Sequence, residues 1–225
     1  MADKTKLWYL ENFNLLSTLK MNEMEELSKI AAMRSCIKNQ VIYFTDDPSD
    51  KIYFLKQGKV KLSRYAADGR EIIVALLGPG EIFGELSISG QERRDETAEA
   101  TEDSVVCILS AAEMERMLEQ NPKFNLSITK LMGLRLQKVE SRLASLIFKS
   151  SEERIYSFIR ESALEHGKQT RDGIEVFLRL THQDIAKLTA TARPTVSAVF
   201  SDLEKRNVIE YNRKRILVKN MEALK

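Results

Sequence analysis

The stretch Leu180–Leu203, LTHQDIAKLTATARPTVSAVFSDL, decides the fold of this chain because it predicts two short helices joined by a tight break. Thr181 and Asp184 have the spacing of a capping box, in which each side chain accepts a hydrogen bond from the other residue's backbone amide. The break falls at residues 189–191, and Pro194 follows where the first turn of a helix tolerates proline. This pattern is typical of a helix-turn-helix that docks into a DNA groove, and an ordinary helical hairpin is the alternative.

The second helix of this stretch separates an apolar side from a small and polar side. The apolar stripe has helical spacing and consists of Val196, Val199, Phe200 and Leu203. The opposite side carries residues that let a helix approach base edges, namely Arg193, Thr195, Ser197, Ala198 and Ser201. The start of the first helix adds contacts near phosphate. The DNA-binding residues predicted on the two helices are therefore Thr181, His182, Gln183, Arg193, Thr195, Ser197 and Ser201.

A wing follows the two helices. Residues 208–218 read as strand, turn and strand, with Arg213, Lys214 and Arg215 at the tip, where they suit contact with phosphate. From residue 176 to residue 225 there are ten Lys and Arg against five Asp and Glu, a surplus of +5, whereas the whole chain carries only +2. This concentration of positive charge indicates an anionic partner for the C-terminal end.

The composition, 43% hydrophobic and 30% charged, fits a globular protein. No apolar run approaches the roughly 20 residues that span a bilayer, and the N-terminus lacks a signal-peptide layout. Cys36 and Cys107 are too few for a disulfide framework or a four-cysteine cluster, so we expect buried or half-buried thiols in a reducing cytoplasm. His166 and His182 are not spaced as zinc ligands, and no Ser/His/Asp or Cys/His arrangement is present. We therefore expect no metal, no cofactor, no membrane contact and no catalysis.

The rest of the chain predicts one helix, a set of short strands and two further helices. Residues 7–33 look helical. Residues 36–109 contain short strand-like runs with turn residues at spacings of roughly 8–12 residues, which favours a barrel or sandwich. Residues 111–118 return to helix, Pro122 breaks it, and a long helical segment follows at 123–148.

The long helix carries a heptad seam. Its members are separated by 4, 3, 4 and 3 residues, and they are Met132, Leu136, Val139, Leu143 and Leu146. The seam could also pack on the helix's own domain, because it is shorter than the roughly three or four heptads of a clear coiled coil. A second apolar set consists of Leu126, Leu131, Leu134 and Ile147. Because a helix with two apolar faces needs two partners, we expect its own barrel and another copy of the chain.

With the barrel, the seam helix and the winged motif in this order, essentially the whole chain resembles the catabolite-activator (CRP/FNR) family of bacterial transcription regulators. The residues that carry the resemblance are Gly58, Gly69, Gly80, Gly84-Glu85-Leu86, Arg93-Arg94 and Arg193-x-Thr195-Val196-Ser197. The resemblance implies an α+β fold. A cyclic-nucleotide-binding-like β-roll with flanking helices would occupy residues 1–120, a dimerisation helix 121–149 and a winged helix-turn-helix domain 150–225.

The resemblance also implies a phosphate–ribose pocket in the β-roll. Gly84 and Glu85 match the positions whose amide and carboxylate meet the ligand. Arg94, or Arg93 if there is a one-residue gap, matches the arginine that forms a charge-assisted pair with phosphate. A plain salt bridge between Glu85 and Arg94, closing an unoccupied pocket, is the alternative.

Two features of this pocket depart from the family's cyclic-AMP responders. Asp95 stands where they have Ser or Thr, and its carboxylate would repel a phosphate. Val139 and Glu140 replace the two hydroxyl residues of the long helix that meet the adenine. We therefore expect weak binding of cyclic AMP.

The DNA motif departs as well. Pro194 and Ala198 replace charged base-reading positions of well-known members, which leaves Arg193 as the main candidate for reading a guanine. Ala190 stands where the turn commonly has Gly.

These features predict a transcription regulator that binds double-stranded DNA as a homodimer; the resemblance implies RNA polymerase as a further partner. A two-fold axis would place the half-sites about 34–36 Å apart, so the site would be an inverted repeat. The regulator would act without cyclic AMP, either when its concentration rises or through another small effector near Glu85 and Arg94. Control by a cyclic nucleotide is the alternative. A small-molecule module that acts only through protein contacts would not need the basic wing.

Overall fold

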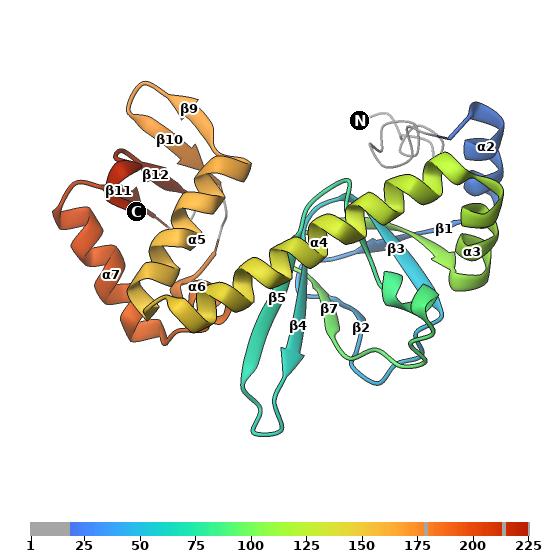
Figure 1. Ribbon diagram of the computed structural model, residues 1–225, viewed down its shortest axis with the longest axis horizontal. Helices are drawn as coiled ribbons and strands as arrows, with labels where there is room; N and C mark the ends of the chain where they lie inside the picture. Colours follow the sequence, from blue (N-terminus) through green and yellow to red (C-terminus); the bar gives the residue numbers. More distant parts are fainter. Residues whose placement is uncertain (1–18, 178–179, 213–214, 225) are drawn as a thin grey trace. The chain divides into compact units, whose positions relative to one another are not determined.

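The computed structural model describes residues 19–177, 180–212 and 215–224, and it divides into two compact units (Figure 1). The division falls between Leu136 and Gln137, inside the helix α4 (Pro122–Phe148). Helix α4 therefore contributes to both units. The first unit is built mainly on strands, and the second on helices and one small sheet.

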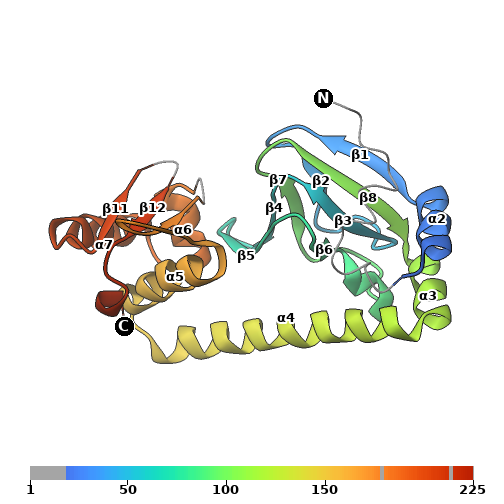
Figure 2. The ribbon, with the colours of Figure 1, turned by 90° about the horizontal axis from the view of Figure 1, so that it is seen from above.

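The first unit is a β-roll of two four-stranded antiparallel sheets (Figure 2). One sheet has the order β1-β8-β3-β6, from β1 (Ala32–Cys36), β8 (Ser104–Ser110), β3 (Lys51–Gln57) and β6 (Ile82–Phe83). The other has the order β2-β7-β4-β5, from β2 (Val41–Tyr43), β7 (Thr97–Ala100), β4 (Val60–Tyr65) and β5 (Glu71–Leu77). Both sheets contribute to one core, which includes Tyr43, Leu55, Val60, Phe83 and Val106. The strand prediction for this region is confirmed.

Helices cover the opposite face of the first sheet. Phe54 and Leu55 are neighbours on β3 and belong to different cores, because successive side chains of a strand point to opposite faces. The core of Phe54 also holds residues of α2 (Met21–Ile30), α3 (Ala111–Gln120) and the beginning of α4. Of the expected helix at residues 7–33, residues 7–18 lie outside the described part of the chain. Helix α2 ends at Ile30, because the chain becomes extended before β1.

Helix α4 packs on the β-roll through a different stripe from the one expected. Phe124 and Ile128 are buried, and Leu131 and Met132 pack against the same core, as the period of 3.6 residues dictates. Met132, expected in the seam, lies one turn after Ile128. Its side chain is therefore partly buried within its own unit. Leu126 and Leu134, two other members of the second apolar set, are both more than half exposed, so the expectation that they are buried against the roll is wrong.

The second unit is a winged helix-turn-helix domain. Its helices are α5 (Ser151–His166), α6 (His182–Thr189) and α7 (Arg193–Lys205), followed near the end of the chain by the short η3 (Glu222–Leu224). Its sheet has the order β11-β12-β10-β9, from β9 (Lys168–Thr170), β10 (Gly173–Val176), β11 (Ile209–Tyr211) and β12 (Ile216–Val218). One core joins helices and sheet and includes Ile155, Ile159, Ile185, Phe200 and Val218.

Strands β9 and β10 were not predicted from the sequence. Residues 168–170 are Lys, Gln and Thr, so β9 has no apolar residue to mark it. Strand β10 is placed by its partner, since Ile174 pairs with Val218 and Val176 with Ile216 of β12. These pairs are formed by residues about 40 positions apart, which local patterns do not reveal.

The turn between α6 and α7 depends on one residue with unusual backbone angles. Ala190 closes α6 with φ 50° and ψ 48°, in the left-handed region. In this region the Cβ of an L-residue crowds the following carbonyl, at a cost of roughly 1–2 kcal/mol. The turn also contains a hydrogen bond of 2.9 Å from the amide of Thr191 to the carbonyl oxygen of Ala186.

Replacing Ala190 by glycine should raise the free energy of unfolding by about 0.5–1 kcal/mol. Glycine adopts the left-handed region without strain, and the gain is reduced by its larger entropy in the unfolded chain. Urea unfolding of the full chain measures the change. Ala198→Gly, on the exposed side of α7, should instead destabilise by about 1 kcal/mol. A loss of stability for Ala190→Gly would contradict the strain argument.

Candidate nucleic-acid interface and effector pocket

The first helix of the DNA motif begins with the predicted capping box. The Thr181 hydroxyl oxygen accepts a hydrogen bond of 3.1 Å from the Asp184 amide, and Asp184 Oδ2 accepts one of 2.9 Å from the Thr181 amide. Asp184 also places negative charge near the positive end of the α6 dipole. The Thr181 side chain is therefore engaged in the cap, whereas Gln183 is exposed in the first turn.

The second helix separates its two sides as the sequence predicted. Val196, Val199, Phe200 and Leu203 are buried in the core of the unit. Arg193 and Ser201 are exposed, and Thr195 is half-buried. Pro194 lies in the first turn, where its missing amide proton leaves no hydrogen bond unmade. The exposed side of α7 can therefore approach a nucleic acid without opening the core.

Two of the predicted DNA contacts instead bind each other. His182 Nδ1 lies 2.9 Å from the Ser197 hydroxyl, and the imidazole stacks on Tyr211 at 4.9 Å between centroids. Burial and the nearby Arg193 guanidinium lower the pKa of His182, so the ring is neutral at neutral pH. His182 and Ser197 thus join α6 to α7, and the contact of His182 with phosphate stays a prediction.

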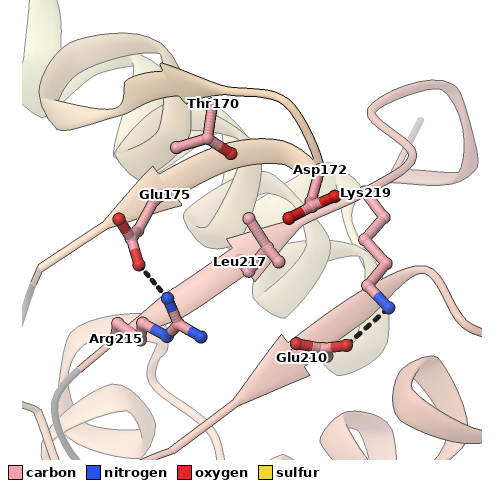
Figure 3. Close-up of a pocket in the computed structure, with 7 residues that line it drawn as sticks. All are labelled: Thr170, Asp172, Glu175, Glu210, Arg215, Leu217 and Lys219. Atoms are coloured by element: carbon pink, nitrogen blue, oxygen red, sulfur yellow. Dashed lines mark hydrogen bonds and ion pairs between the residues drawn. The ribbon is translucent and has the colours of Figure 1, made fainter.

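The predicted wing forms between β11 and β12, which pair in antiparallel register. Arg213 and Lys214, expected at its tip, lie outside the described residues. Arg215 directly precedes the return strand β12, and its guanidinium forms an ion pair with Glu175 of β10 (Figure 3). The carboxylate comes from a strand that the sequence did not predict. It competes with any phosphate for Arg215.

The sheet of the second unit bears a polar pocket of about 480 Å³ on the face that carries Glu175 and Arg215 (Figure 3). It is lined by Thr170, Asp172, Glu175, Glu210, Arg215, Leu217 and Lys219. Lys219 Nζ lies 2.6 Å from Glu210 Oε1, so each basic side chain of the lining pairs with a carboxylate. Among the described residues, those that line this pocket therefore carry no excess of positive charge.

In the β-roll, Arg94 lies in the position expected for a ligand-binding arginine. It is only 3% exposed, and Nη1 donates a hydrogen bond of 2.9 Å to the carbonyl oxygen of Gly84. Nη2 donates to the carbonyl oxygen of Lys51, and the guanidinium lies over the Tyr43 ring at 4.6 Å. Glycine is favoured at position 84 because its φ is +75° and a Cβ would lie 2.9 Å from the backbone carbonyl oxygen of Lys51. By contrast, Arg93 is exposed and donates to the carbonyl oxygen of Asp46, so the structure brings Arg94 to Gly84.

Glu85 does not pair with Arg94. It begins η2 (Glu85–Ser89), and its carboxylate forms an ion pair with Arg135 of α4, which also donates to the carbonyl oxygen of Ile82. The alternative of a plain Glu85–Arg94 salt bridge is therefore wrong. Arg135 was not among the residues predicted from the sequence; its spacing of seven residues from Ile128 places it on the side of α4 that packs on the roll.

The departures at Asp95 and Val139 have different settings. The Asp95 carboxylate forms an ion pair with Arg64, and both side chains are about half exposed, so part of the charge expected to repel a phosphate is compensated. Val139 is 64% exposed and makes no polar contact, as its side chain requires. Glu140 is also exposed.

The expected seam of α4 is uncovered in the single chain beyond Met132. The exposed fractions are 59% for Leu136, 64% for Val139, 57% for Leu143 and 43% for Leu146. Soluble proteins rarely leave a continuous row of large apolar side chains open to water, so such a row marks an interaction surface.

The described residues also bear on three other kinds of site: thiols, metal sites and membrane-spanning helices. Cys36 and Cys107 are buried thiols, as predicted, and burial raises the pKa of Cys36. Within residues 19–177, 180–212 and 215–224, no group of three or more His, Cys, Asp or Glu side chains could hold a metal ion. In the same part of the chain, no helix is long and apolar enough to cross a membrane.

Comparison with known proteins agrees with both units. The sequence model of the cyclic nucleotide-binding domain matches residues 33–121, and that of the Crp-like helix-turn-helix domain matches residues 141–225. A global nitrogen regulator from Synechocystis is 34% identical over 189 residues, covering 83% of this chain and 84% of the relative. A CRP-like cAMP-activated global transcriptional regulator from Mycobacterium tuberculosis is 27% identical over 187 residues, with 83% and 84% covered.

Among solved structures, a CooA mutant from Carboxydothermus hydrogenoformans has a TM-score of 0.78 at 24% identity, covering 89% of this chain and 88% of the other. At this identity the likeness concerns the fold alone. Together with the Synechocystis relative and the two matched domains, it leads to one family. The chain belongs to the CRP/FNR family of DNA-binding transcription regulators.

Proposed function

We propose that this regulator acts as a homodimer on an inverted-repeat DNA site, without requiring cyclic AMP. The observation that carries the proposal is the exposed apolar row of α4 in a chain that also contains a helix-turn-helix. Leu136, Val139 and Leu143 are each more than half exposed. A second copy of the same helix offers a matching row, and burying such side chains stabilises an interface by about 1.5 kcal/mol or more each.

The roles of the DNA-contacting residues follow from their exposure. Arg193 is exposed at the beginning of α7, where a bidentate guanidinium can read a guanine. Gln183, Thr195 and Ser201 would contact phosphate or base edges beside it. In the wing, Arg213 and Lys214 would neutralise phosphate, with Arg215 contributing after it leaves Glu175. RNA polymerase would be a further partner, as is usual for such regulators.

The independence from cyclic AMP rests on the contacts in the β-roll. Both terminal nitrogens of Arg94 already donate to backbone carbonyls, so two of its five N–H donors are engaged before any phosphate enters. Glu85, the expected partner of a ribose hydroxyl, is held by Arg135. Val139 offers no hydrogen bond to a base. These three observations favour a protein that is active when its concentration rises.

A second candidate function keeps the same regulator but gives it an effector near Glu85 and Arg94. One of the named relatives is a cAMP-activated regulator, so a small molecule controls at least one similar protein. The orphan Nε of Arg94 favours this alternative, because it is buried and makes no hydrogen bond within the described structure. Calorimetry on the free protein separates the two candidate functions, because only the second requires a small molecule to bind.

Val139→Asp should weaken dimerisation by at least tenfold, because it buries an unpaired carboxylate in the apolar seam. Sedimentation equilibrium measures the association constant. Ser141→Asp is the matched control, since Ser141 is exposed on the same helix and outside the seam. A monomeric unaltered protein, or a dimer indifferent to the aspartate, would show that the seam is not the interface.

Arg193→Ala should cost roughly 1–3 kcal/mol of binding free energy on a site selected from random duplexes, and it should relax the preference at one position. Lys214→Ala should weaken the selected and random duplexes about equally and reduce the slope of log affinity against log salt by about 0.9. Fluorescence anisotropy across a range of salt concentrations measures both. Equal losses for Arg193→Ala on both duplexes would reverse the assignment of roles.

Cyclic AMP should change the affinity for the selected site by less than threefold, because the pocket lacks the contacts through which the ligand would favour one state. Anisotropy titrations with and without the nucleotide, beside calorimetry on the free protein, provide the measurement. Micromolar binding together with a tenfold or greater gain in DNA affinity, about 1.4 kcal/mol of coupling, would overturn the proposal in favour of control by cyclic nucleotide.

A further inference from the structure

The turn that precedes the recognition helix is held by two arginines from outside the helix-turn-helix. Three successive carbonyl groups at the end of α6 receive guanidinium N–H donors. Arg142 Nη2 donates to the oxygen of Leu188 at 2.7 Å, Arg154 Nε to Thr189 at 2.9 Å and Arg154 Nη2 to Ala190 at 3.0 Å.

These contacts suit the chemistry of a helix end. The last four carbonyls of an α-helix have no partner within the helix, and the negative end of its dipole attracts cations. A guanidinium supplies several N–H donors in a planar fork, so Arg154 can serve two adjacent carbonyls at once. One of these belongs to Ala190, the strained left-handed residue, which the hydrogen bond helps to hold in place.

The two arginines come from different helices. Arg154 lies on α5, and its Nη1 donates at 2.9 Å to the carbonyl oxygen of Lys149, in the segment between α4 and α5. Arg142 lies on α4, within the part of that helix that belongs to the second unit, and burial lowers its pKa. The turn is thereby connected to α4, α5 and their junction.

Arg142 also occupies a particular side of α4. With Ser145 it forms the partly buried side of the helix in this unit, while Val139, Leu143 and Leu146 remain exposed. Residues 142 and 143 are adjacent, so their side chains leave the helix roughly 100° apart. One side of this segment therefore faces the turn of the DNA motif, and the neighbouring side carries the proposed dimer seam.

We infer that Arg142 and Arg154 form a clamp that sets the orientation of α7, so that they act as positioning residues for sequence-specific DNA binding. The clamp transmits the placement of α4 to the turn at residues 188–190, and from there to Arg193 three residues later. This inference rests on the proposed function, because it requires the dimer seam and the recognition of DNA by α7.

Single variants of the full chain test the clamp. Arg142→Ala and Arg154→Ala should each lower the affinity for the selected inverted repeat at least tenfold. They should leave the affinity for a random duplex and the sedimentation mass within twofold of the unaltered values. The matched control is Lys138→Ala, which lies one turn before Arg142 on α4 and pairs with Glu165 of α5 instead of the turn. It should change neither affinity by more than twofold.

A combined variant separates positioning from simple stabilisation of the turn. Ala190→Gly removes the backbone strain that Arg154 helps to hold, so the pair Arg154→Ala/Ala190→Gly should recover thermal stability. If this double variant still binds the selected site at least tenfold more weakly than the unaltered protein does, the positioning role of Arg154 is supported. If glycine restores specific affinity as well, the arginine only stabilises the turn and the inference fails.

The remaining outcomes are equally decisive. Equal losses on selected and random duplexes, a loss as large for Lys138→Ala, or unchanged binding by both arginine variants would each overturn the clamp while leaving the proposed function intact. An unaltered protein that is monomeric, or that selects no DNA site, would overturn the proposed function and the clamp together.

Discussion

The long helix α4 makes three chemically different kinds of contact along its length, and most of the structure depends on them. Its beginning buries Phe124 and Ile128 in the β-roll. In its middle, Arg135 forms an ion pair with Glu85. Nearer its end, Arg142 donates a hydrogen bond to the turn of the helix-turn-helix. Within each unit, the period of 3.6 residues separates these contacts from the exposed row of Leu136, Val139 and Leu143. A single helix can therefore be anchored in each unit and still offer an apolar row to a second copy.

In both units, arginine side chains form many of the polar contacts, and they do so by donating hydrogen bonds to backbone carbonyls. Arg94 donates to Gly84 and Lys51, Arg135 to Ile82, and Arg154 to Thr189 and Ala190. A buried guanidinium is costly unless its donors are satisfied, and carbonyl groups satisfy them without adding a second charge. In the β-roll, Arg94 donates two hydrogen bonds to the backbone, while its buried Nε makes none. A ligand could therefore bind to Arg94 without displacing these two hydrogen bonds.

The DNA-binding unit shows how neighbouring elements limit which polar residues are free to bind. His182 and Ser197 bond each other between α6 and α7, and Thr181 completes the cap of α6. Arg215 is held by Glu175 from β10. The polar residues that remain exposed on the motif, such as Arg193 and Gln183, are consequently fewer than the polar residues that it contains. Under the proposed function, specificity would depend on this small set of side chains and on how precisely α7 is placed.

Local patterns in the sequence were sufficient for the elements whose signals are short-range. The capping box at Thr181, the apolar stripe of α7 and the short strands of the β-roll all formed as expected, because caps and periodicity act within a few residues. Tertiary structure alone decided the partners of charged side chains and the strands β9 and β10. Glu85 meets Arg135, 50 residues away, and Arg215 meets Glu175, 40 residues away. Long side chains can reach several partners, so their pairing follows from how the elements pack and not from their spacing along the chain.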